Sequence, residues 1–255
     1  MNDTTTRGDV KIAGAGTVAT GSYRDVRVSG SATLTGEIEC VLLKVDGAAD
    51  GRGTIKAERI AVSGGMKFDG DVETGVLKIS GSAWYGGAVR AGEMRVAGTA
   101  DVRADLASDV VEVQGALTVH GDCQAERFVA QGAFTVDGLL NAGVVDIHLH
   151  GTSRAREIGG EAITVRYAPF PLQRIVAMFL TNQGRLTAEI IEGDDVRLEQ
   201  TKVRVVRGKR VAIGTGCEVE LVEYTESFEQ ASDARVKTAR KTGDGSDAAT
   251  SEEDV

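Results

Sequence analysis

The sequence has little proline, few aromatic residues and no long apolar run. Only 2 of its 255 residues are proline, and 4% are aromatic. The scarcity of proline excludes a collagen-like chain, although glycine, with 33 residues, is well above the ~7% of an average protein. No stretch approaches the ~18 uninterrupted apolar residues of a membrane-spanning helix. Because 42% of the residues are hydrophobic, the chain can build a core, which argues against a disordered linker.

Acidic residues outnumber basic ones, 38 to 29, and paired cysteines are absent. The net charge of -9 and the pI near 5.0 disfavour binding of nucleic acid. The cysteines, Cys40, Cys123 and Cys217, show no CxxC spacing, so we expect buried, reduced thiols. The opening residues MNDTTTRGDV lack the features of a signal peptide. Together these observations predict a cytoplasmic protein.

Glycine recurs in two columns with a period of 17 residues. The first column comprises Gly30, Gly47, Gly64, Gly81, Gly98, Gly115 and Gly132, flanked at slightly different spacings by Gly14 and Gly151. The second column lies six residues later and comprises Gly36, Gly53, Gly70, Gly87, Gly121 and Gly138, with Ala104 as the exception. Two columns in phase over seven units predict a structural repeat.

Apolar residues follow the same period. Four residues before each first-column glycine stand Val26, Leu43, Ile60, Leu77, Met94, Val111 and Phe128. Two residues before it stand Val28, Val45, Val62, Ile79, Val96, Val113 and Ala130. Two residues after it stand Ala32, Ala49, Met66, Ala83, Ala100, Leu117 and Phe134. Eight residues after it stand Ile38, Ile55, Val72, Val89, Leu106, Cys123 and Leu140. Their alternation with polar residues is the period of a strand with one buried face.

About three short strands per unit, separated by glycine corners, predict an all-β fold, a right-handed parallel β-helix. We attribute the glycines to corner conformations that other residues do not adopt. Helical repeats need units of about 33 residues and a different apolar spacing. A left-handed hexapeptide coil needs landmark residues every six positions, whereas its third slot here holds residues of no common type: Leu42, Arg59, Val76, Glu93, Val110 and Arg127.

The repeat divides the chain into five segments. Residues 1–8 form a polar lead, and residues 9–165 form about nine turns. Residues 166–187 contain both prolines and interrupt the pattern. Alternation returns in residues 188–224, which we interpret as about two closing turns, and residues 225–255 are predicted to be a disordered acidic tail. About eleven turns at ~4.8 Å each give a rod roughly 50 Å long.

The sequence shows no catalytic, cofactor-binding or metal-binding signature. GxSxG, P-loop and HExxH motifs are absent, and the Gly-x-Gly matches belong to the repeat. His148 and His150 would share one face of a strand, but neither they nor His120 have a suitably spaced third ligand. We therefore expect solvent-facing imidazoles, no enzyme activity and no cofactor.

Two charged columns and one tryptophan are candidates for contacts with partners. The basic column consists of Arg27, Lys44, Lys78 and Arg95, and the acidic column of Glu37, Asp71, Asp105 and Asp122. A solubilising surface and the electrostatic docking of a partner are both open interpretations of these columns. Trp84 is predicted to point outward beside the inward Tyr85, and an exposed tryptophan indicates an interaction site.

The interruption at residues 166–187 is the least polar stretch of the chain. Two interpretations are open: a short helix that packs on the rod, or a contact with a membrane or partner protein. The apolar residues that would make this contact are Phe170, Ile175, Val176, Phe179 and Leu180.

The two ends of a parallel β-helix carry unpaired strands, which are templates for another chain. No amphipathic helix near the start would cover the turn that contains Val10, Ile12 and Val18. At the other end Val219, Leu221 and Tyr224 lead directly into the polar tail. These six residues are therefore predicted to form contacts between copies stacked end to end, without a nucleotide.

The repeated segments VRVSGSATLTGEIEC, LKISGSAWYGGAV and VEVQGALTVHGDCQAERF resemble the bactofilins, a family of polymer-forming bacterial cytoskeletal proteins. The closing VVRGKRVAIGTGCEVELVEY is similar to the longer subgroup typical of Gram-positive bacteria. The resemblance covers about residues 9–224. It implies a right-handed β-helix that polymerises through its ends and serves as a scaffold for envelope, cell-shape or motility machinery, often at the membrane. The break at residues 166–187 departs from the uninterrupted helix of typical bactofilins.

Three functions follow from these observations. The leading hypothesis is a non-enzymatic, self-assembling cytoplasmic scaffold whose partners are its own copies and envelope or motility proteins. The second is a monomeric adaptor that presents its faces, or residues 166–187, to a membrane or partner. The third is a β-helix enzyme, which needs clustered acidic residues or a histidine in a cleft between turns, and the sequence shows neither.

Overall fold

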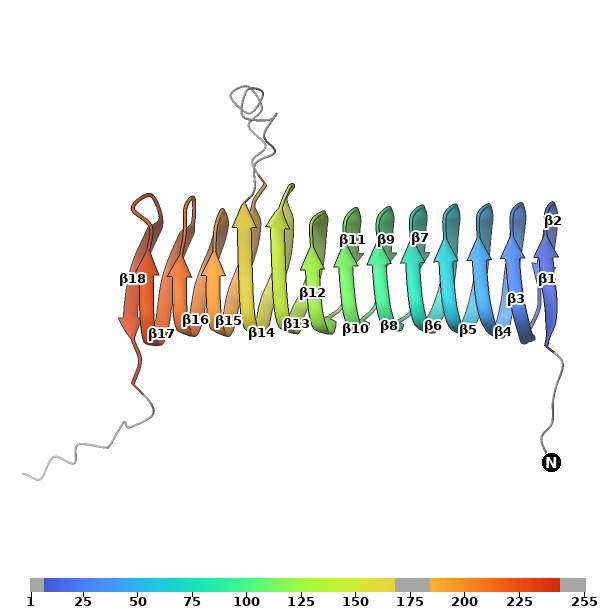
Figure 1. The fold of residues 1–255 in the computed structure, drawn as a ribbon, viewed down its shortest axis with the longest axis horizontal. Coiled ribbons are helices and arrows are strands. Elements are labelled where there is room, and N and C mark those ends of the chain that lie inside the picture. Colours follow the sequence, from blue (N-terminus) through green and yellow to red (C-terminus); the bar gives the residue numbers. More distant parts are fainter. Residues whose placement is uncertain (1–6, 168–183, 244–255) are drawn as a thin grey trace, which may run out of the picture.

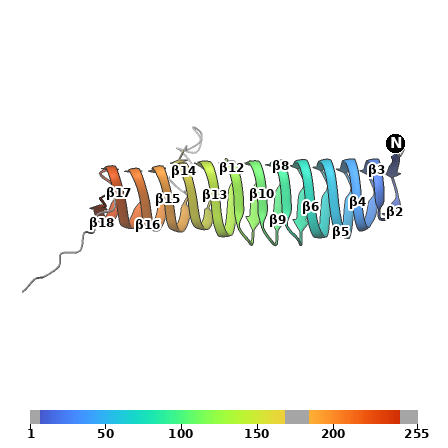
Figure 2. The same ribbon diagram turned by 90° about the horizontal axis from the view of Figure 1, so that it is seen from below.

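The computed structural model describes residues 7–167 and 184–243, which form one straight coil of strands (Figures 1 and 2). All 18 strands belong to a single sheet, and the described residues contain no helix. The strands are β1 (Gly8–Ile12), β2 (Ala15–Val18), β3 (Gly21–Val28), β4 (Ser31–Val45), β5 (Ala48–Val62), β6 (Gly65–Ile79), β7 (Ser82–Tyr85), β8 (Val89–Val96), β9 (Thr99–Val102), β10 (Leu106–Val113), β11 (Ala116–Val119), β12 (Cys123–Ala130), β13 (Ala133–Leu149), β14 (Ser153–Tyr167), β15 (Leu186–Leu198), β16 (Thr201–Ile213), β17 (Glu218–Gln230) and β18 (Arg235–Lys241).

Each strand pairs in parallel with its equivalent one turn away. Leu43 of β4, for example, lies opposite Ile60 of β5, which lies opposite Leu77 of β6. The turns that begin at Ile12 and end at Gln230 number about 13. The predicted parallel β-helix is thereby confirmed, with two turns more than expected, because the chain after Gly151 forms four turns rather than two.

The interior is formed by the apolar columns found in the sequence. Every residue in the four predicted columns is buried and at most 4% exposed. The structure adds an inward column four residues after the first-column glycine, of which the sequence analysis recognised only Tyr85 as inward: Val18, Leu34, Gly51, Phe68, Tyr85, Val102, Val119 and Val136. A further inward-facing column holds small residues: Cys40, Ala57, Thr74, Ala91, Ser108, Ala125 and Ala142.

The first-column glycines are required because successive turns lie very close together. The sequence predicted a different cause, corner conformations that other residues do not adopt, and this was wrong for the first column. Positive φ angles among the described glycines are confined to Gly36, Gly53, Gly70 and Gly216, so the first column has ordinary backbone conformations. A Cβ on Gly64, however, would lie only 2.6 Å from the Asp46 carbonyl oxygen and would collide with that of Gly47. The backbone of each turn therefore approaches that of the next too closely for any side chain.

The second column includes glycines whose conformation does matter. Gly36 has a φ of 79° and Gly53 a φ of 128°, which side chains disfavour. The two columns thus have different physical causes, close approach in the first and backbone conformation in part of the second.

The segment boundaries differ from the predicted ones on both sides of the interruption and at the tail. β14 continues to Tyr167 and β15 begins at Leu186, so strands occupy both margins of the predicted insertion. The predicted disordered tail was wrong for residues 225–243, because β17 extends to Gln230 and β18 follows it. The sequence did not predict these strands, because apolar residues in this segment recur too irregularly to match the apolar columns. Residues 168–183 and 244–255 lie outside the described part of the chain.

Candidate functional site

The N-terminal end of the coil exposes two strand edges in the described part of the chain. β1 pairs only with β3, and β2 pairs only with β4. Val10 and Ile12 are partly buried and pack against the core, whereas Val18 is only 1% exposed. Val10 and Ile12 therefore lie at the end, as predicted, while Val18 belongs to the interior.

Two side chains of β3 hold this end together. The Tyr23 hydroxyl donates a hydrogen bond to the Ala19 carbonyl oxygen at 2.8 Å. Tyr23 lies in register with Cys40, in a column otherwise filled by small residues. Arg24 donates two hydrogen bonds to Asp9 of β1, at 2.9 and 2.6 Å, and this guanidinium lowers the pKa of the Asp9 carboxyl. The first turn is thus well attached, although nothing described covers its outer edge.

The C-terminal end lies one strand further along the chain than the sequence indicated. Val219, Leu221 and Tyr224 lie opposite residues of β18, so their strand is not the last one, although Tyr224 remains partly exposed. The end is formed instead by β18 and by the last part of β17, whose outer edges are unpaired among the described residues. Sequence reasoning missed β18 because its RVKTARK pattern contains a single large apolar residue, Val236.

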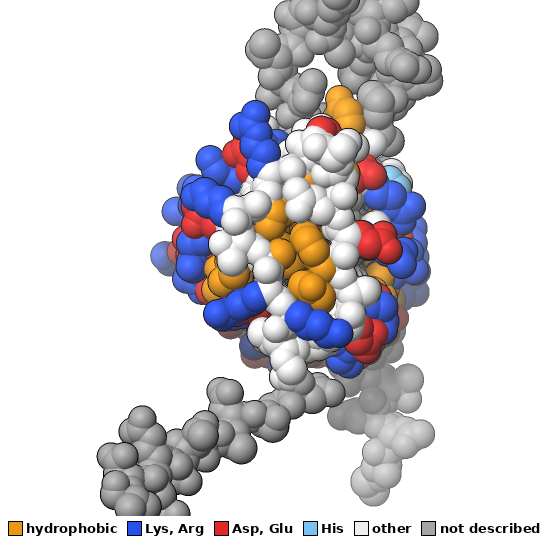
Figure 3. Space-filling view, turned by 90° about the vertical axis from the view of Figure 1, so that its left-hand side faces the viewer, with side chains coloured by type: hydrophobic (Ala, Val, Ile, Leu, Met, Phe, Trp, Pro, Cys, Tyr) orange, Lys and Arg blue, Asp and Glu red, His pale blue; other side chains and the backbone are white. Residues whose placement is uncertain are grey.

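Apolar side chains are accessible at the centre of this end. Tyr224, Phe228, Ala231 and Val236 are partly buried and pack against the core, and the rings of Tyr224 and Phe228 stack with centroids 5.4 Å apart. Figure 3, which looks at this end, shows hydrophobic side chains at the centre, surrounded by backbone and uncharged polar side chains and then by charged residues. The core therefore continues to the surface instead of ending under a cap of described residues.

The other predicted contact residues are not gathered at one place. Trp84 points outward, is half-buried, and has the Lys67 ammonium 5.4 Å from its ring centre. Tyr85 beside it is fully buried, as predicted. The interruption's candidate residues lie outside the described residues: Phe170, Ile175, Val176, Phe179 and Leu180.

Three aspartates of the acidic column bind backbone of the following turn. Asp71 accepts a hydrogen bond from the Ala88 N–H at 2.8 Å, Asp105 from the Asp122 N–H at 2.9 Å, and Asp122 from the Leu139 N–H at 2.8 Å. A Cβ on Gly87, Gly121 or Gly138 would collide with the carboxylate of the turn before. The aspartate thus binds the backbone of the next turn, and the glycine leaves the space that the carboxylate needs. This arrangement favours a structural role for the acidic column over partner docking.

We expect the substitution Asp122→Ala to lower the free energy of unfolding by about 1 kcal/mol, because the Leu139 N–H loses a charged acceptor. Asp122→Asn keeps an acceptor oxygen and should lose less. Asp109→Ala is the control, since this exposed carboxylate has no hydrogen bond or ion pair in the described chain. Urea denaturation measures all three, and equal stability of the two alanine variants would contradict the structural role.

Three residues of the basic column, Arg27, Lys44 and Arg95, form local ion pairs, and His120 has close polar neighbours. Arg27 pairs with Asp25 at 2.9 Å and Lys44 with Asp46 at 2.8 Å. His120 lies 2.9 Å from Arg103 on one side and 2.9 Å from Asp137 on the other. Among the described residues no group of three or more His, Cys, Asp or Glu side chains is placed to hold a metal ion.

The cysteines are buried free thiols, as predicted. Cys40, Cys123 and Cys217 are at most 3% exposed. Burial raises their pKa values to about 11, 12 and 11 respectively, so all three are protonated near neutral pH. They are therefore unsuited to act as nucleophiles.

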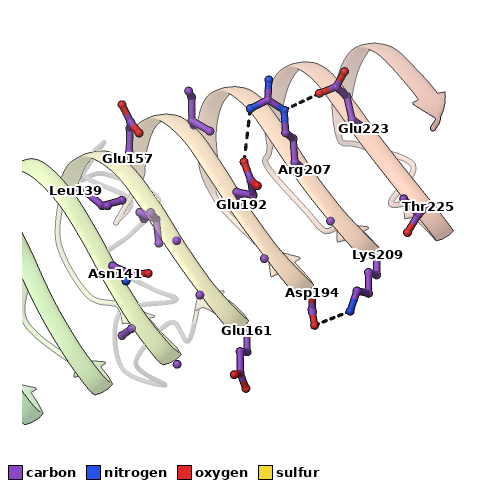
Figure 4. Close-up of a pocket in the computed structure, with 18 of the residues that line it drawn as sticks. Leu139, Asn141, Glu157, Glu161, Glu192, Asp194, Arg207, Lys209, Glu223 and Thr225 are labelled. Carbon is purple, nitrogen blue, oxygen red and sulfur yellow. Dashed lines mark hydrogen bonds and ion pairs between the residues drawn. The ribbon is translucent and has the colours of Figure 1, made fainter. Parts of the chain in front are cut away.

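A shallow groove of about 810 Å³ runs along the flank of the later turns, above small residues such as Gly160, Gly193 and Gly208. Its charged side chains neutralise one another rather than converge on a common point (Figure 4). Arg207 bridges Glu223 at 2.6 Å and Glu192 at 3.5 Å, and Lys209 pairs with Asp194 at 2.9 Å. This arrangement supports the packing of successive turns and offers no pair of groups poised for acid–base chemistry.

In residues 7–167 and 184–243, no helix is long and apolar enough to cross a lipid bilayer.

Comparison with known proteins identifies two similar sequences, both from Bacillus subtilis (strain 168). The uncharacterized protein YhbF is 41% identical over 105 residues, which are 41% of this chain and 42% of YhbF. The uncharacterized protein YhbE is 43% identical over 107 residues, which are 41% of this chain and 43% of YhbE. The chain thus spans about two-fifths of the length of these curated relatives. No family model and no solved structure matches it.

Proposed function

We propose that this protein is a non-enzymatic bacterial scaffold that assembles end to end without a nucleotide. The observation that carries the proposal is the open state of both ends, where described strand edges are unpaired and apolar core residues reach the surface. An unpaired edge of parallel strands is a template for another chain, and a second copy supplies the matching strands. Association buries the exposed apolar side chains and completes the missing backbone hydrogen bonds.

The cellular role in the proposal comes from the resemblance to the bactofilins. A filament of such rods in the cytoplasm, in peripheral contact with the membrane, would position envelope, cell-shape or motility proteins along its length. The long, uniform flanks of the coil suit repeated attachment of partners. The lack of convergent catalytic groups in the described groove supports a structural role over an enzymatic one.

Negative-stain microscopy of the purified protein without nucleotide tests the assembly. We expect filaments whose length increases with protein concentration. Rods of a single length, roughly 60 Å for about 13 turns, at every salt and protein concentration would refute the polymer. Concentration-independent sedimentation together with binding to an envelope protein would support the monomeric adaptor instead.

Charged substitutions at each end identify the contact. Val10→Asp with Ile12→Asp changes the first turn, and Phe228→Asp with Val236→Asp changes the last. We expect each pair to shorten or abolish filaments, because a charge must then be buried at the junction. Thr33→Asp, on the exposed flank, is the matched control and should leave assembly unchanged. Normal filaments from both end variants would exclude the ends as the contact.

A further inference from the structure

One outward column of the coil alternates aliphatic and charged residues from turn to turn. It lies just before the buried column of Val26 to Phe128, and the strand register aligns all its members. The alternating column consists of Asp25, Leu42, Arg59, Val76, Glu93, Val110, Arg127 and Val144. In the sequence these residues showed no common type, because each kind recurs only every second turn.

The charges in this column also alternate in sign. The order along the rod is Asp25, Arg59, Glu93 and Arg127, so each charge is followed two turns later, roughly 10 Å away, by its opposite. Arg59 and Arg127 are exposed and form no ion pair within the described residues, whereas Asp25 and Glu93 each pair with the arginine two residues later in their own chain, Arg27 and Arg95. Val144, at the end of the column, is 42% exposed, and the intervening Leu42, Val76 and Val110 are half-buried. Unpaired cations and exposed aliphatic side chains on a regular face are features of a contact surface.

We propose that this face pairs side by side with a second copy of the chain, antiparallel, about a two-fold axis at Val76. This arrangement sets Arg59 opposite Glu93 of the other copy and Asp25 opposite Arg127. It also sets Leu42 opposite Val110, and Val76 opposite its own equivalent. Two-fold symmetry makes each contact off the axis occur twice, which is the usual geometry of a closed pair.

Other alignments match less well. A shift of one turn sets each charge against an aliphatic side chain. A shift of two turns sets like charges against each other, for example Arg59 against Arg127. A parallel copy displaced by two turns gives opposite charges at three positions instead of four, and it leaves an open, unclosed contact.

The neighbouring outward column agrees with the same axis. Lys44 would face Glu112 of the second copy, since these residues lie two turns on either side of Lys78. Lys78 itself would face its own equivalent, which is the one unfavourable pair near the axis. Lys78→Gln should therefore strengthen the contact, whereas substitution of a favourably paired lysine should weaken it.

The size of the face indicates a weak contact between single chains. Seven overlapping turns of ~4.8 Å and a strand of four or five residues present on the order of 500 Å² per copy, below the ~800 Å² of a typical stable partner. Copies joined into longer rods would repeat the contact and strengthen it by multivalency. The proposal goes beyond end-to-end assembly and is tested separately from it.

Cysteine cross-linking tests the axis. Val76→Cys should form a disulfide-linked dimer by itself under mild oxidation with copper phenanthroline. Leu42→Cys and Val110→Cys should cross-link to each other in a mixture far faster than either does alone. Thr54→Cys, on another face, is the control, and the native cysteines are buried. Equal rates for Val76→Cys and Thr54→Cys, or cross-linking of Leu42→Cys with Val76→Cys instead, would overturn the antiparallel pair.

A charge exchange gives a second, independent measurement. Arg59→Glu and Glu93→Arg should each reduce the cross-linking rate of Val76→Cys at least tenfold, because like charges then meet. The double variant restores opposite charges and should recover the rate. Arg52→Glu, exposed on a different face, should have no effect. Failure of the double variant to recover, while microscopy still shows filaments, would refute the lateral pair and leave end-to-end assembly intact.

Discussion

Replacing Gly64 with alanine is expected to destabilise the coil by about 3–5 kcal/mol, at the upper end of effects of single substitutions. The added Cβ would lie 2.6 Å from the carbonyl oxygen and 2.9 Å from the carbonyl carbon of Asp46, and it would collide with the Gly47 carbonyl oxygen. These atoms are backbone, so no rotamer change relieves the overlap. Two paired turns would have to move apart and lose hydrogen bonds between their strands.

The adjacent Gly65 provides the matched control for this prediction. A Cβ on Gly65 meets no atom within 4 Å, and its φ is not positive. Gly65→Ala is therefore expected to be neutral, or to stabilise by up to about 1 kcal/mol by restricting the unfolded chain. Urea denaturation compares the two variants, and hydrogen exchange should locate the loss in β4 to β6. Similar stabilities for the two variants would contradict the role assigned to the first column.

Phe68→Ala is the second substitution with a large expected effect. It should lower the free energy of unfolding by about 4–5 kcal/mol. Phe68 is completely buried and lies in register between Gly51 and Tyr85. Gly51 has no side chain to move into the vacated space, so the cavity persists and the full cost is expected.

Trp84→Ala is the control for loss of an aromatic side chain. Trp84 follows Phe68 by about one turn but points outward, and its described partner is the Lys67 ammonium. Its removal is expected to cost less than about 1 kcal/mol, the value of an exposed cation–π contact. Thermal unfolding followed by circular dichroism measures both variants. A larger loss for Trp84→Ala than for Phe68→Ala would reverse the assignment of inward and outward positions.

Much of the fold was readable from the sequence because a solenoid repeats one environment. Each turn places the equivalent position against the core, so the apolar residues Leu43, Ile60 and Leu77, 17 positions apart, together indicate one buried column. The inward column of Leu34, Gly51 and Phe68 was not recognised, because Gly51 breaks its apolar character.

The candidate site was only partly predictable. Val10 and Ile12 lie at the first turn as expected, since the chain enters the coil at its first strand. The other end was misplaced, because β18 is held by its backbone pairing with β17 and contributes only Val236 to the apolar pattern. Strand pairing of this kind depends on the neighbouring turn and leaves little trace in the residues themselves.

The sequence alone determined the fold class, the period of the coil and four of the columns that face its interior, because these follow from which side chains avoid water. The tertiary structure decided why glycine is required, what the column aspartates bind and where the coil ends. Each of these depends on the distance between residues about 17 positions apart, which periodicity implies but does not measure. The scarcity of proline has the same origin, since nearly every strand in the coil pairs on both sides and needs its backbone N–H groups.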